Sequence, residues 1–491
     1  MGPGAYDGPM PLRRRLSVAL IALLLGACGA SSDASQSPAP SKAATPIPVI
    51  VDTDVEQSDL AALAILLRDP AIDVRAITIA GTGLVHCSGG RRAVRYVLEE
   101  LGSPDIPYAC GREDGGPDAR PFPDEWRATA DAAYGLAIPP KALPATPPDA
   151  VTLLADAVAA SPSAPTIVAL GPWTNLEDAF AADPTLADRV AGIHAMLGTI
   201  EAPGNVLVDG HTTAEPLEWN AFADPSAVAA VLATDVPVSL VPLDATDDVP
   251  FPADLLDRLA ADHAAGGADL VYELLVRWPP RTRAAEGQQL WDELAVLALT
   301  APDLVTWEDM DIATVDGPDG TTDGATGIIV SDPAGRPARV ATAADGPAVG
   351  AALLEALDRG DARITPFAVA GEIAIGFDGT SCTRTADSSG PGFHLVSFTS
   401  TAGQPSGVQL GGVRAPATWA DLLTTLTTFD FATGVPPEWY IDAASIADAS
   451  GSGEAITTTV ALEAETYGPL CFTGQTPSVT VTPGEPFDIP D

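Results

Sequence analysis

The sequence predicts an α/β protein with a mostly parallel sheet flanked by helices, followed by a small all-β sandwich. Two observations predict this organisation. Apolar strand-like segments alternate with helix-like segments between residues 47 and 363, whereas short β-prone segments separated by Gly, Ser, Thr and Pro fill residues 364 to 491. The 491 residues also exceed one ordinary core, because domains usually contain about 100 to 200 residues. We therefore expect two folded domains.

The first domain begins with a strand, a helix and a second strand. Pro48–Asp52 is an apolar run, Asp59–Leu67 has helical spacing, and Val74–Ala80 is a second apolar run. The alternation continues with segments at Val151–Ala160, Thr166–Leu170, Leu176–Ala181, Ile193–Leu197, Pro225–Leu232 and Val238–Val241. Such an order predicts parallel βαβ units, and their ligand sites form at the carboxyl ends of the strands.

The C-terminal region contains segments typical of a small antiparallel sandwich. These are Glu372–Gly376, Phe393–Ser400, Ile456–Ala461 and Ser478–Val481. Its late segment from Tyr467 to Cys471 resembles the late strand of cupredoxin-like sandwiches. Copper would need two histidines beside that cysteine, and only His394 is present. We therefore expect a module without metal that is closed by a disulfide.

The N-terminal segment has the pattern of a bacterial lipoprotein signal. Three arginines precede an apolar run at Leu16–Leu25, which ends in Gly26-Ala27-Cys28. This pattern predicts a signal peptide over residues 1–27, a lipid anchor on Cys28 and a Ser/Ala/Pro-rich tether over residues 28–46. The protein would then be exported and held on the outer side of the cell membrane by its lipid. The alternative is a chance apolar leader followed by a cysteine.

The other four cysteines predict two structural disulfides. After Cys28, an even number of cysteines is left, two in the first half and two in the last quarter of the chain. We pair Cys87 with Cys110 and Cys382 with Cys471. Neither pair has the close spacing of a zinc or redox motif, so disulfides are favoured over metal or thiol chemistry.

The charge of the chain limits its partners. There are 66 acidic and 24 basic residues, which give a net charge of −42. A field of this sign repels nucleic acid polymers and suits cations or small neutral ligands. A simpler interpretation is that the acidity keeps an exported protein in solution. The charge therefore excludes a polymer of nucleic acid as partner without naming a substrate.

A cluster of acids follows the first strand. Asp52, Asp54 and Asp59 lie where an apolar strand passes into a helix. Crowded carboxylates repel one another unless a cation lies among them, and aspartate oxygens are ligands that calcium prefers. The alternative is that Asp59 is an acid at a helix N-terminus and Asp54 an ordinary loop acid.

Three later segments also carry polar groups at strand ends or helix starts. They are Leu170-Gly171-Pro172-Trp173-Thr174-Asn175, then Glu218-Trp219-Asn220, then Trp291-Asp292. Each one alone can be explained by capping or turn chemistry.

Together and in this order, the four motifs resemble those of the inosine-uridine-preferring nucleoside hydrolase family. Asp52, Asp54 and Asp59 match the first, second and last acids of its D-x-D-x-x-x-D-D cluster. The later segments resemble its A-L-G-P-L-T-N turn, its E-F-N element and the aspartate of its late H-D pair. The resemblance covers about Pro48 to Arg363. It implies a nucleoside hydrolase-like fold and hydrolysis of the N-glycosidic bond of ribonucleosides to free base and ribose.

The resemblance also implies roles for single residues. Asp54, Asp59, Asp292 and the backbone carbonyl of Leu170 would hold one Ca²⁺ ion. Asp54 would activate a calcium-bound water for attack on C1′ of the ribose. The sugar hydroxyls would be held by Glu218 and Asn220, together with Asn205, which we favour over Thr212 for the family's sugar-binding asparagine.

The sequence departs from the family pattern at three places. Val55-Glu56 replaces the usual Pro-Gly, and Ser58 replaces an acid that contacts the ribose, so Ser58 keeps a hydrogen bond and loses a charge. Trp291 replaces the histidine associated with protonation of the leaving base. An indole can stack on a base, which favours purines, but it cannot donate a proton as an acid. The structural alternative for Trp291 is a packed core aromatic.

Three functions remain open at this point. The first is an extracytoplasmic nucleoside hydrolase for salvage of bases or ribose, with a small-molecule ribonucleoside as substrate. The second is a catalytically weakened surface lipoprotein that binds ribose or nucleosides, and the third is an adhesive or structural lipoprotein. The three separated acids favour the enzyme, because a scaffold has no use for acids that converge on one point. The preferred base and assembly into a homo-oligomer are left open.

Overall fold

The computed structural model describes residues 45–491 apart from a few short segments. The described ranges are 45–139, 141, 143, 149–208, 210–277, 288–316, 325–362, 369–427, 437, 439–448, 451, 453, 455–474 and 480–490. The expected signal peptide, most of the tether and Cys28 lie outside these ranges, as does the expected domain boundary at residue 363. Among the helices of the described ranges, none combines the length and the apolar character needed to cross a membrane.

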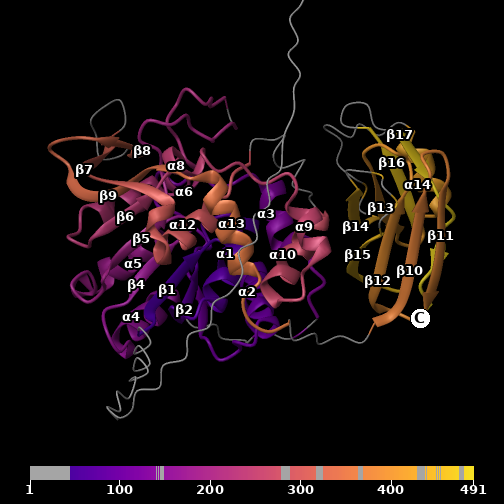
Figure 1. Ribbon diagram of the computed structural model, residues 1–491, viewed down its shortest axis with the longest axis horizontal. Coiled ribbons are helices and arrows are strands. Elements are labelled where there is room, and N and C mark those ends of the chain that lie inside the picture. Colours follow the sequence, from indigo (N-terminus) through magenta and orange to yellow (C-terminus); the bar gives the residue numbers. More distant parts are fainter. Residues whose placement is uncertain are drawn as a thin grey trace, which may run out of the picture. The chain divides into compact units, whose positions relative to one another are not determined.

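A sheet of nine strands forms the frame of the α/β domain (Figure 1). In spatial order its strands are β3 (Tyr108–Cys110), β2 (Ile72–Ile79), β1 (Ile47–Thr53), β4 (Thr166–Ala169), β5 (Gly192–Met196), β6 (Val238–Val241), β9 (Arg336–Ala344), β7 (Val305–Asp316) and β8 (Ala325–Ser331). The strands from β3 to β9 pair in parallel, and β7 pairs antiparallel with both β9 and β8. The expected mostly parallel sheet is thereby confirmed, and the antiparallel β7–β8 edge is an addition to it.

The strand order reverses beside β1. The chain first adds β2 and β3 on one side of β1 and then places β4 on the other side. In an open parallel sheet, ligands bind at such a switch point, outside the carboxyl ends of the strands. Thr53 at the end of β1 and Ala169 at the end of β4 therefore mark the expected place of a site.

Helices cover both faces of this sheet. The face that contains Val49 and Val51 shares one hydrophobic core with α1 (Gln57–Arg68), α2 (Cys87–Glu100), α10 (Gly266–Arg277), α12 (Trp291–Thr300) and α13 (Gly346–Leu357). The opposite face, which contains Ile50, is covered by α4 (Ala150–Ala160), α5 (Thr174–Ala182) and α7 (Pro225–Leu232). Shorter helices are α3 (Asp124–Asp131), α6 (Trp219–Ala223), α8 (Leu243–Thr246) and α9 (Leu255–Ala261).

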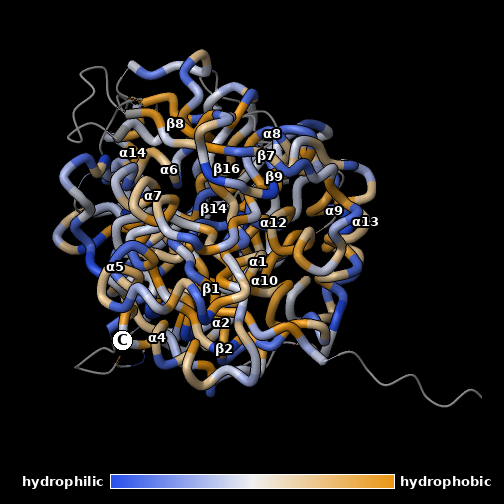
Figure 2. Tube along the Cα trace, turned by 90° about the vertical axis from the view of Figure 1, so that its left-hand side faces the viewer, coloured by the Kyte–Doolittle hydropathy of each residue, from blue (hydrophilic) through white to orange (hydrophobic). Residues whose placement is uncertain are grey.

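Strand β1 is apolar on both faces because both faces are covered. Its side chains alternate, so Val49 and Val51 contact one hydrophobic core and Ile50 contacts the other. Figure 2 shows hydrophobic residues gathered around β1, α1 and α10. The rigid, doubly buried strand fixes the position of the acids that follow it.

The C-terminal region forms two sheets around a core of its own. One sheet contains β11 (Cys382–Ser388), β10 (Val369–Phe377), β12 (Gly392–Ser400) and β15 (Ala455–Leu462). The other contains β14 (Tyr440–Asp448), β13 (Ser406–Val413), β16 (Thr466–Thr473), β17 (Thr480–Pro483) and β18 (Phe487–Asp488). A helix, α14 (Trp419–Leu426), interrupts the strands. Inward-facing residues such as Ile375 and Val408 make the core.

The expected all-β region with antiparallel sheets is confirmed, and one strand pair departs from the antiparallel pattern. Strand β10 pairs antiparallel with β11 but parallel with β12. Because β11 occupies one edge of β10, the next strand of the chain lies on the other edge and runs in the same direction as β10. The remaining pairs of the two sheets are antiparallel.

Both predicted disulfides are present. Cys87 at the start of α2 is bonded to Cys110 at the end of β3, and Cys382 in β11 is bonded to Cys471 in β16. The second bond therefore joins the two sheets of the sandwich. The first lies beside the β2–α2 connection, which borders the candidate site described below.

Candidate active site at the carboxyl ends of the parallel strands

A cavity of about 840 Å³ opens at the switch point. It brings together side chains from the ends of β1, β4 and β5 and from the starts of α1, α6 and α12. All nine residues that the sequence assigned to metal or substrate line this cavity: Asp54, Ser58, Asp59, Leu170, Asn205, Glu218, Asn220, Trp291 and Asp292. Residues more than 200 positions apart in the chain therefore meet at one place.

The turn from β1 into α1 fixes the first group of acids. Val55 has a φ of 60°, in the left-handed region that a β-branched residue rarely adopts, and its N–H donates to Thr53 Oγ1 at 3.0 Å. Glu56 then caps α1, because its Oε2 accepts from the backbone N–H of Ser58 and its own N–H donates to Asp59 Oδ2 at 3.0 Å. This reciprocal capping box holds both Glu56 and Asp59 at the start of the helix.

Asp52 does not line the cavity but joins two of the segments that form it. It is fully buried, and its Oδ1 accepts from Thr78 Oγ1 at 2.5 Å and from Asn175 Nδ2 at 2.7 Å. Burial raises the pKa of Asp52 to about 7, although both hydrogen bonds act in the opposite direction. Asn175 ends the motif at Leu170–Asn175, so this bond ties the β4–α5 turn to the end of β1.

Asp54 occupies a place that two glycines leave free. Its Oδ2 accepts from the backbone N–H of Leu84 at 2.8 Å. A Cβ atom on Gly83 would lie 2.3 Å from Asp54 Cβ, and one on Gly171 would lie 2.9 Å from the same atom. These approaches are closer than non-bonded carbon atoms allow, so both turns need glycine to admit Asp54. The sequence analysis did not single out Gly83.

Replacing Gly83 by alanine is therefore expected to displace Asp54 and to reduce kcat/KM by about 100-fold, since a misplacement of about 1 Å can have that effect. The matched control is Gly350→Ala in α13, where a Cβ meets no atom within 4 Å. This control should keep full activity and gain up to about 1 kcal/mol of stability from its better helix propensity. Steady-state kinetics and thermal unfolding of both variants measure this difference. Equal activity of the two variants would contradict the steric role of Gly83.

Three carboxylates converge most closely in the cavity. One oxygen each of Glu56, Asp59 and Asp292 lies within 4.8 Å of the others, and Asp54 lies outside this group. Asp59 also accepts from Thr53 Oγ1, and Asp292 Oδ2 accepts from Ser58 Oγ. The sequence analysis noted Glu56 only as a departure from the family pattern. The position of Glu56 between the expected ligands Asp54 and Asp59 could have indicated its place in the group.

The donors of this group fit a hard divalent cation such as calcium. Oxygen ligands from carboxylates and carbonyls are those that calcium prefers. Asp292 is only 3% exposed, and its Oδ1 has no hydrogen-bond partner in the described part of the chain. A buried carboxylate oxygen without a donor is unfavourable by itself and becomes favourable when a cation contacts it. The family resemblance and this geometry share two donors, Asp59 and Asp292. The resemblance adds Asp54 and the carbonyl of Leu170, and the geometry adds Glu56.

Burial and mutual repulsion weaken these acids in the absence of a cation. Burial is the main cause that raises the pKa of Asp54 to about 7, and the neighbouring Glu56 adds to it. Burial also raises the pKa of Asp59 and of Asp292, and the charge of Asp292 raises that of Asp59 further. The protein therefore binds protons at this cluster when no cation is present.

The raised pKa of Asp54 predicts a pH-dependent stability in chelator. Between the ordinary pKa of 3.8 and about 7, the folded state binds this proton and the unfolded state has lost it. The free energy of unfolding of the protein without metal should therefore fall as the pH rises through this window. Thermal melts from pH 4.5 to 8 would show it, and Asp54→Asn should have a shallower slope. Identical slopes for the two proteins would contradict the raised pKa.

The residues expected to bind the sugar also hold the site together. Glu218 caps α6, with Oε1 accepting from Asn220 N–H at 2.8 Å and Oε2 from Gly198 N–H at 2.8 Å. Asn220 Nδ2 donates to the carbonyl oxygens of Leu170 at 2.9 Å and Met196 at 3.1 Å. Asn220 thereby links the ends of β4 and β5. Much of the hydrogen-bonding capacity of Glu218 is directed to the backbone, which the sequence did not reveal.

Asn205, rather than Thr212, and Trp291 lie at the cavity. Asn205 lines the cavity, and its buried Oδ1 has no hydrogen-bond partner within the described residues, whereas Thr212 is exposed and does not line it. The Nε1 atom of Trp291 is likewise buried without a partner there. Phe122 stacks on Trp219 with ring centroids 4.6 Å apart, and Trp126 lies against the same indole. These three aromatic residues line the cavity and form its aromatic wall.

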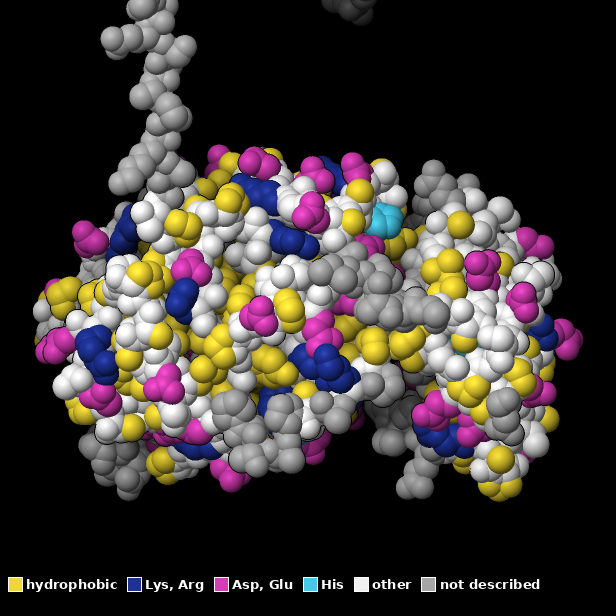
Figure 3. Space-filling view, turned by 90° about the horizontal axis from the view of Figure 1, so that it is seen from below, with side chains coloured by type: hydrophobic (Ala, Val, Ile, Leu, Met, Phe, Trp, Pro, Cys, Tyr) yellow, Lys and Arg dark blue, Asp and Glu magenta, His cyan; other side chains and the backbone are white. Residues whose placement is uncertain are grey.

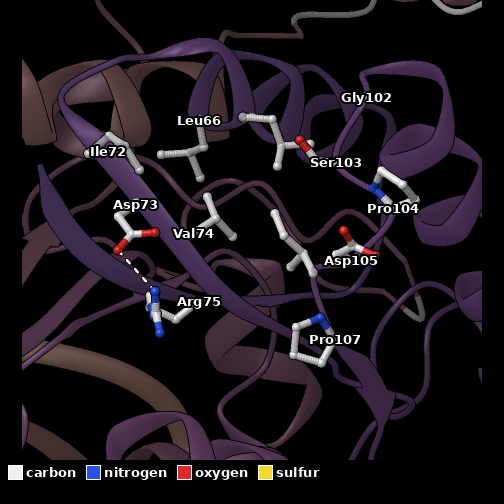
Figure 4. A pocket seen from close by; sticks show the side chains of 12 residues that line it. Leu66, Ile72, Asp73, Val74, Arg75, Gly102, Ser103, Pro104, Asp105 and Pro107 are labelled. Carbon is white, nitrogen blue, oxygen red and sulfur yellow. Dashed lines mark hydrogen bonds and ion pairs between the residues drawn. The ribbon is translucent and has the colours of Figure 1, made fainter. Parts of the chain in front are cut away.

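A second hollow lies at the opposite end of the sheet. It has a volume of about 460 Å³ and lies where β2 begins, between residues 66–75 and 102–107 (Figure 4). Asp73 and Arg75 form an ion pair across part of it at 3.2 Å. The hollow lacks the convergent carboxylates of the larger cavity.

On the surface, acidic side chains are scattered among basic and hydrophobic ones on the face that Figure 3 shows.

Similarity to known proteins identifies the family to which this fold belongs. Residues 49–350 match the family model of the inosine-uridine preferring nucleoside hydrolases. Uridine nucleosidase 1 of Arabidopsis thaliana is 25% identical over 270 residues, which cover 53% of this chain and 76% of that protein. Probable uridine nucleosidase 2 of the same plant is 29% identical over 269 residues, which cover 53% and 79%.

A solved structure shows the same fold. The inosine-uridine preferring nucleoside hydrolase from Bacillus anthracis matches with a TM-score of 0.55 and 22% identity, over 63% of this chain and 99% of that one. The fold and the site define an enzyme class that acts on N-glycosyl bonds. This chain belongs to the inosine-uridine preferring nucleoside hydrolase family.

Proposed function

We propose that this protein hydrolyses the N-glycosidic bond of ribonucleosides in a calcium-dependent manner and releases free base and ribose. The observation that carries the proposal is the placement of Asp54 beside the group of Glu56, Asp59 and Asp292, inside a cavity at the switch point of the sheet. The family relationship supports the reaction class. The metal and the roles of single residues follow from the family resemblance, and the convergence of the acids supports them.

Asp54, Asp59, Asp292 and the carbonyl of Leu170 would hold the calcium ion, which would supply positive charge that lowers the pKa of a nearby water and attracts the ribose 2′ and 3′ hydroxyls. Asp54 accepts a proton from the attacking water. The water oxygen forms a bond to C1′ while the bond from C1′ to the base nitrogen breaks, and its electron pair leaves with the base. Deprotonated Asp54 is needed for this step, and a bound cation favours that form by its positive charge.

The sugar is oriented by the residues around Asn220. Asn205 offers a buried Oδ1 without a partner among the described residues, which suits a ribose hydroxyl as donor. Glu218 and Asn220 act on the sugar in two ways. They fix the backbone around the site, and their remaining donors and acceptors can bind sugar hydroxyls. Contacts that tighten as positive charge develops on the ribose lower the barrier, because they are stronger in the transition state than in the bound substrate.

Trp291 and the aromatic wall contact the base in this proposal. A tryptophan gains more stacking area from a bicyclic purine than from a pyrimidine, so we expect a preference for purine nucleosides. The indole cannot protonate the leaving base as an acid. The two Arabidopsis relatives carry the name of uridine nucleosidases, so uridine is the necessary comparison.

We also propose that the protein is exported and lipid-anchored at Cys28. The basic, apolar and small-residue pattern before Cys28 supports this location, and the disulfides are compatible with an oxidising compartment. Metabolic labelling with a radioactive fatty acid should mark the wild-type protein and leave Cys28→Ser unlabelled. Equal labelling of both would contradict the anchor.

The function is tested by release of base and reducing sugar from inosine, guanosine, adenosine and uridine, each assayed separately. The chain from Gly29 to Asp491 is used with calcium and with chelator. Release that requires calcium supports the hydrolase, and the rates rank the bases. Absence of release from every nucleoside, together with tight calcium binding, would contradict the assignment for these substrates.

One observation favours a second function. The hydroxyl of Ser58 donates to Asp292, although the family has an acid that contacts ribose at this position. A site weakened in this way supports a surface protein that binds ribose or nucleosides without turnover. Equilibrium binding of ribose in the absence of product formation would distinguish it from the enzyme.

A further inference from the structure

The chain carries an acid at position 56, beside the proposed cation site, where the family pattern has none. Glu56 stands where the family has glycine, two positions before Ser58, where the family has an acid. The exchange keeps the number of negative charges in this turn and moves one of them.

The structure places the Glu56 carboxylate beside two expected ligands of the cation. One oxygen each of Glu56, Asp59 and Asp292 lies within 4.8 Å of the others, and Glu56 also lines the cavity. The left-handed conformation of Val55 precedes it and determines the direction in which the chain enters α1. Asp292, whose buried Oδ1 has no hydrogen-bond partner in the described residues, comes from the distant helix α12.

Helix capping by itself does not explain a glutamate at this position. The residues favoured at an N-cap are Ser, Thr, Asp and Asn, whose short side chains reach the first free N–H groups. The cap of α1 uses Oε2 of Glu56, through the bond to Ser58 N–H at 2.5 Å. The carboxylate has a second oxygen, and calcium accepts about six to eight oxygen ligands.

We propose that Glu56 is a direct ligand of the cation and replaces the charge that Ser58 lacks. This inference rests on the proposed calcium-dependent function and adds a residue to its site. Glu56 then joins Asp54, Asp59 and Asp292 as a carboxylate ligand. Ser58, which donates to Asp292 Oδ2, orients that ligand.

The test is calcium binding by isothermal titration calorimetry, with a separate readout of stability in chelator. Glu56→Gln keeps an oxygen that accepts from Ser58 N–H and removes the charge. Its affinity for calcium should fall about 10- to 100-fold, while its melting temperature in chelator stays equal to or above that of the wild type. The matched control is Glu113→Gln, because Glu113 also accepts a backbone N–H, from Cys87 at 2.6 Å, but does not line the cavity.

A second variant keeps the test decisive if Glu56→Gln unfolds. Glu56→Ser provides a favoured N-cap residue without the reach to a cation, and it should show the same loss of affinity. Calcium affinity within twofold of the wild type in the folded variant would overturn the role of Glu56 and leave the proposed function intact. A wild-type chain that binds no calcium would instead overturn the calcium-dependent function, and this inference with it.

Discussion

Asp54→Asn is expected to lower kcat by about 100- to 10,000-fold at saturating calcium, the usual contribution of a general base. Asparagine keeps the shape of the side chain and an oxygen that can accept from Leu84 N–H, but it cannot take a proton from water at neutral pH. Because one buried carboxylate is removed from a repelling group, stability in chelator should not fall. Initial rates and thermal melts measure the two effects.

The matched control for this variant is Asp73→Asn. Asp73 is an acid of the same type at the other end of the sheet, where it pairs with Arg75 near the surface. Surface ion pairs contribute at most about 1 kcal/mol, so this change should leave the kinetics unaltered. A kcat of Asp54→Asn within threefold of the wild-type value would remove Asp54 from its role as base. Calcium affinity must be measured in parallel, because Asp54 is also an expected ligand.

The parts of the fold that depend on local pattern could be read from the sequence. Strand β6 and helix α7 have the bounds that the sequence indicated, because a doubly covered strand is a short apolar run and Pro225 marks the start of its helix. The parallel pairing of β10 with β12 could not be read in this way. It depends on which edge of β10 is already occupied by β11, and side-chain alternation carries no information on that choice.

In the candidate site too, features set by local sequence could be predicted, and features set by contacts between distant segments could not. Acids that follow strands or begin helices were found from the sequence, since a parallel sheet brings such positions together. The contribution of Glu56 was missed, because its approach to Asp292 depends on the conformation of the β1–α1 turn and on a helix more than 200 residues away. The need for glycine at position 83 was also missed, because it arises from contact with Asp54 rather than from a turn.

Asp292→Asn is expected to weaken calcium binding by at least about 100-fold, and with it activity at low calcium. The attraction between one unit charge and a divalent cation about 4 Å away is roughly 8 kcal/mol at an effective dielectric constant of about 20, before compensation by water. The amide oxygen can still accept from Ser58 Oγ, so the fold should be retained. In chelator, the melting temperature of this variant should equal or exceed that of the wild type, because the repulsion that raises the pKa of Asp59 is reduced.

The variant Ser58→Ala distinguishes the contribution of the Asp292 charge to calcium binding from the contribution of its orientation. This variant keeps all three carboxylates but removes the hydroxyl that donates to Asp292 Oδ2. Its calcium affinity should fall less than that of Asp292→Asn, by about tenfold, as is typical for a group that orients a metal ligand. If Asp292→Asn bound calcium as tightly as the wild type, the buried Oδ1 would not face the cation, and the donors would have to be sought nearer to Asp54 and Leu170. Titration of the three proteins under one set of conditions decides between these arrangements.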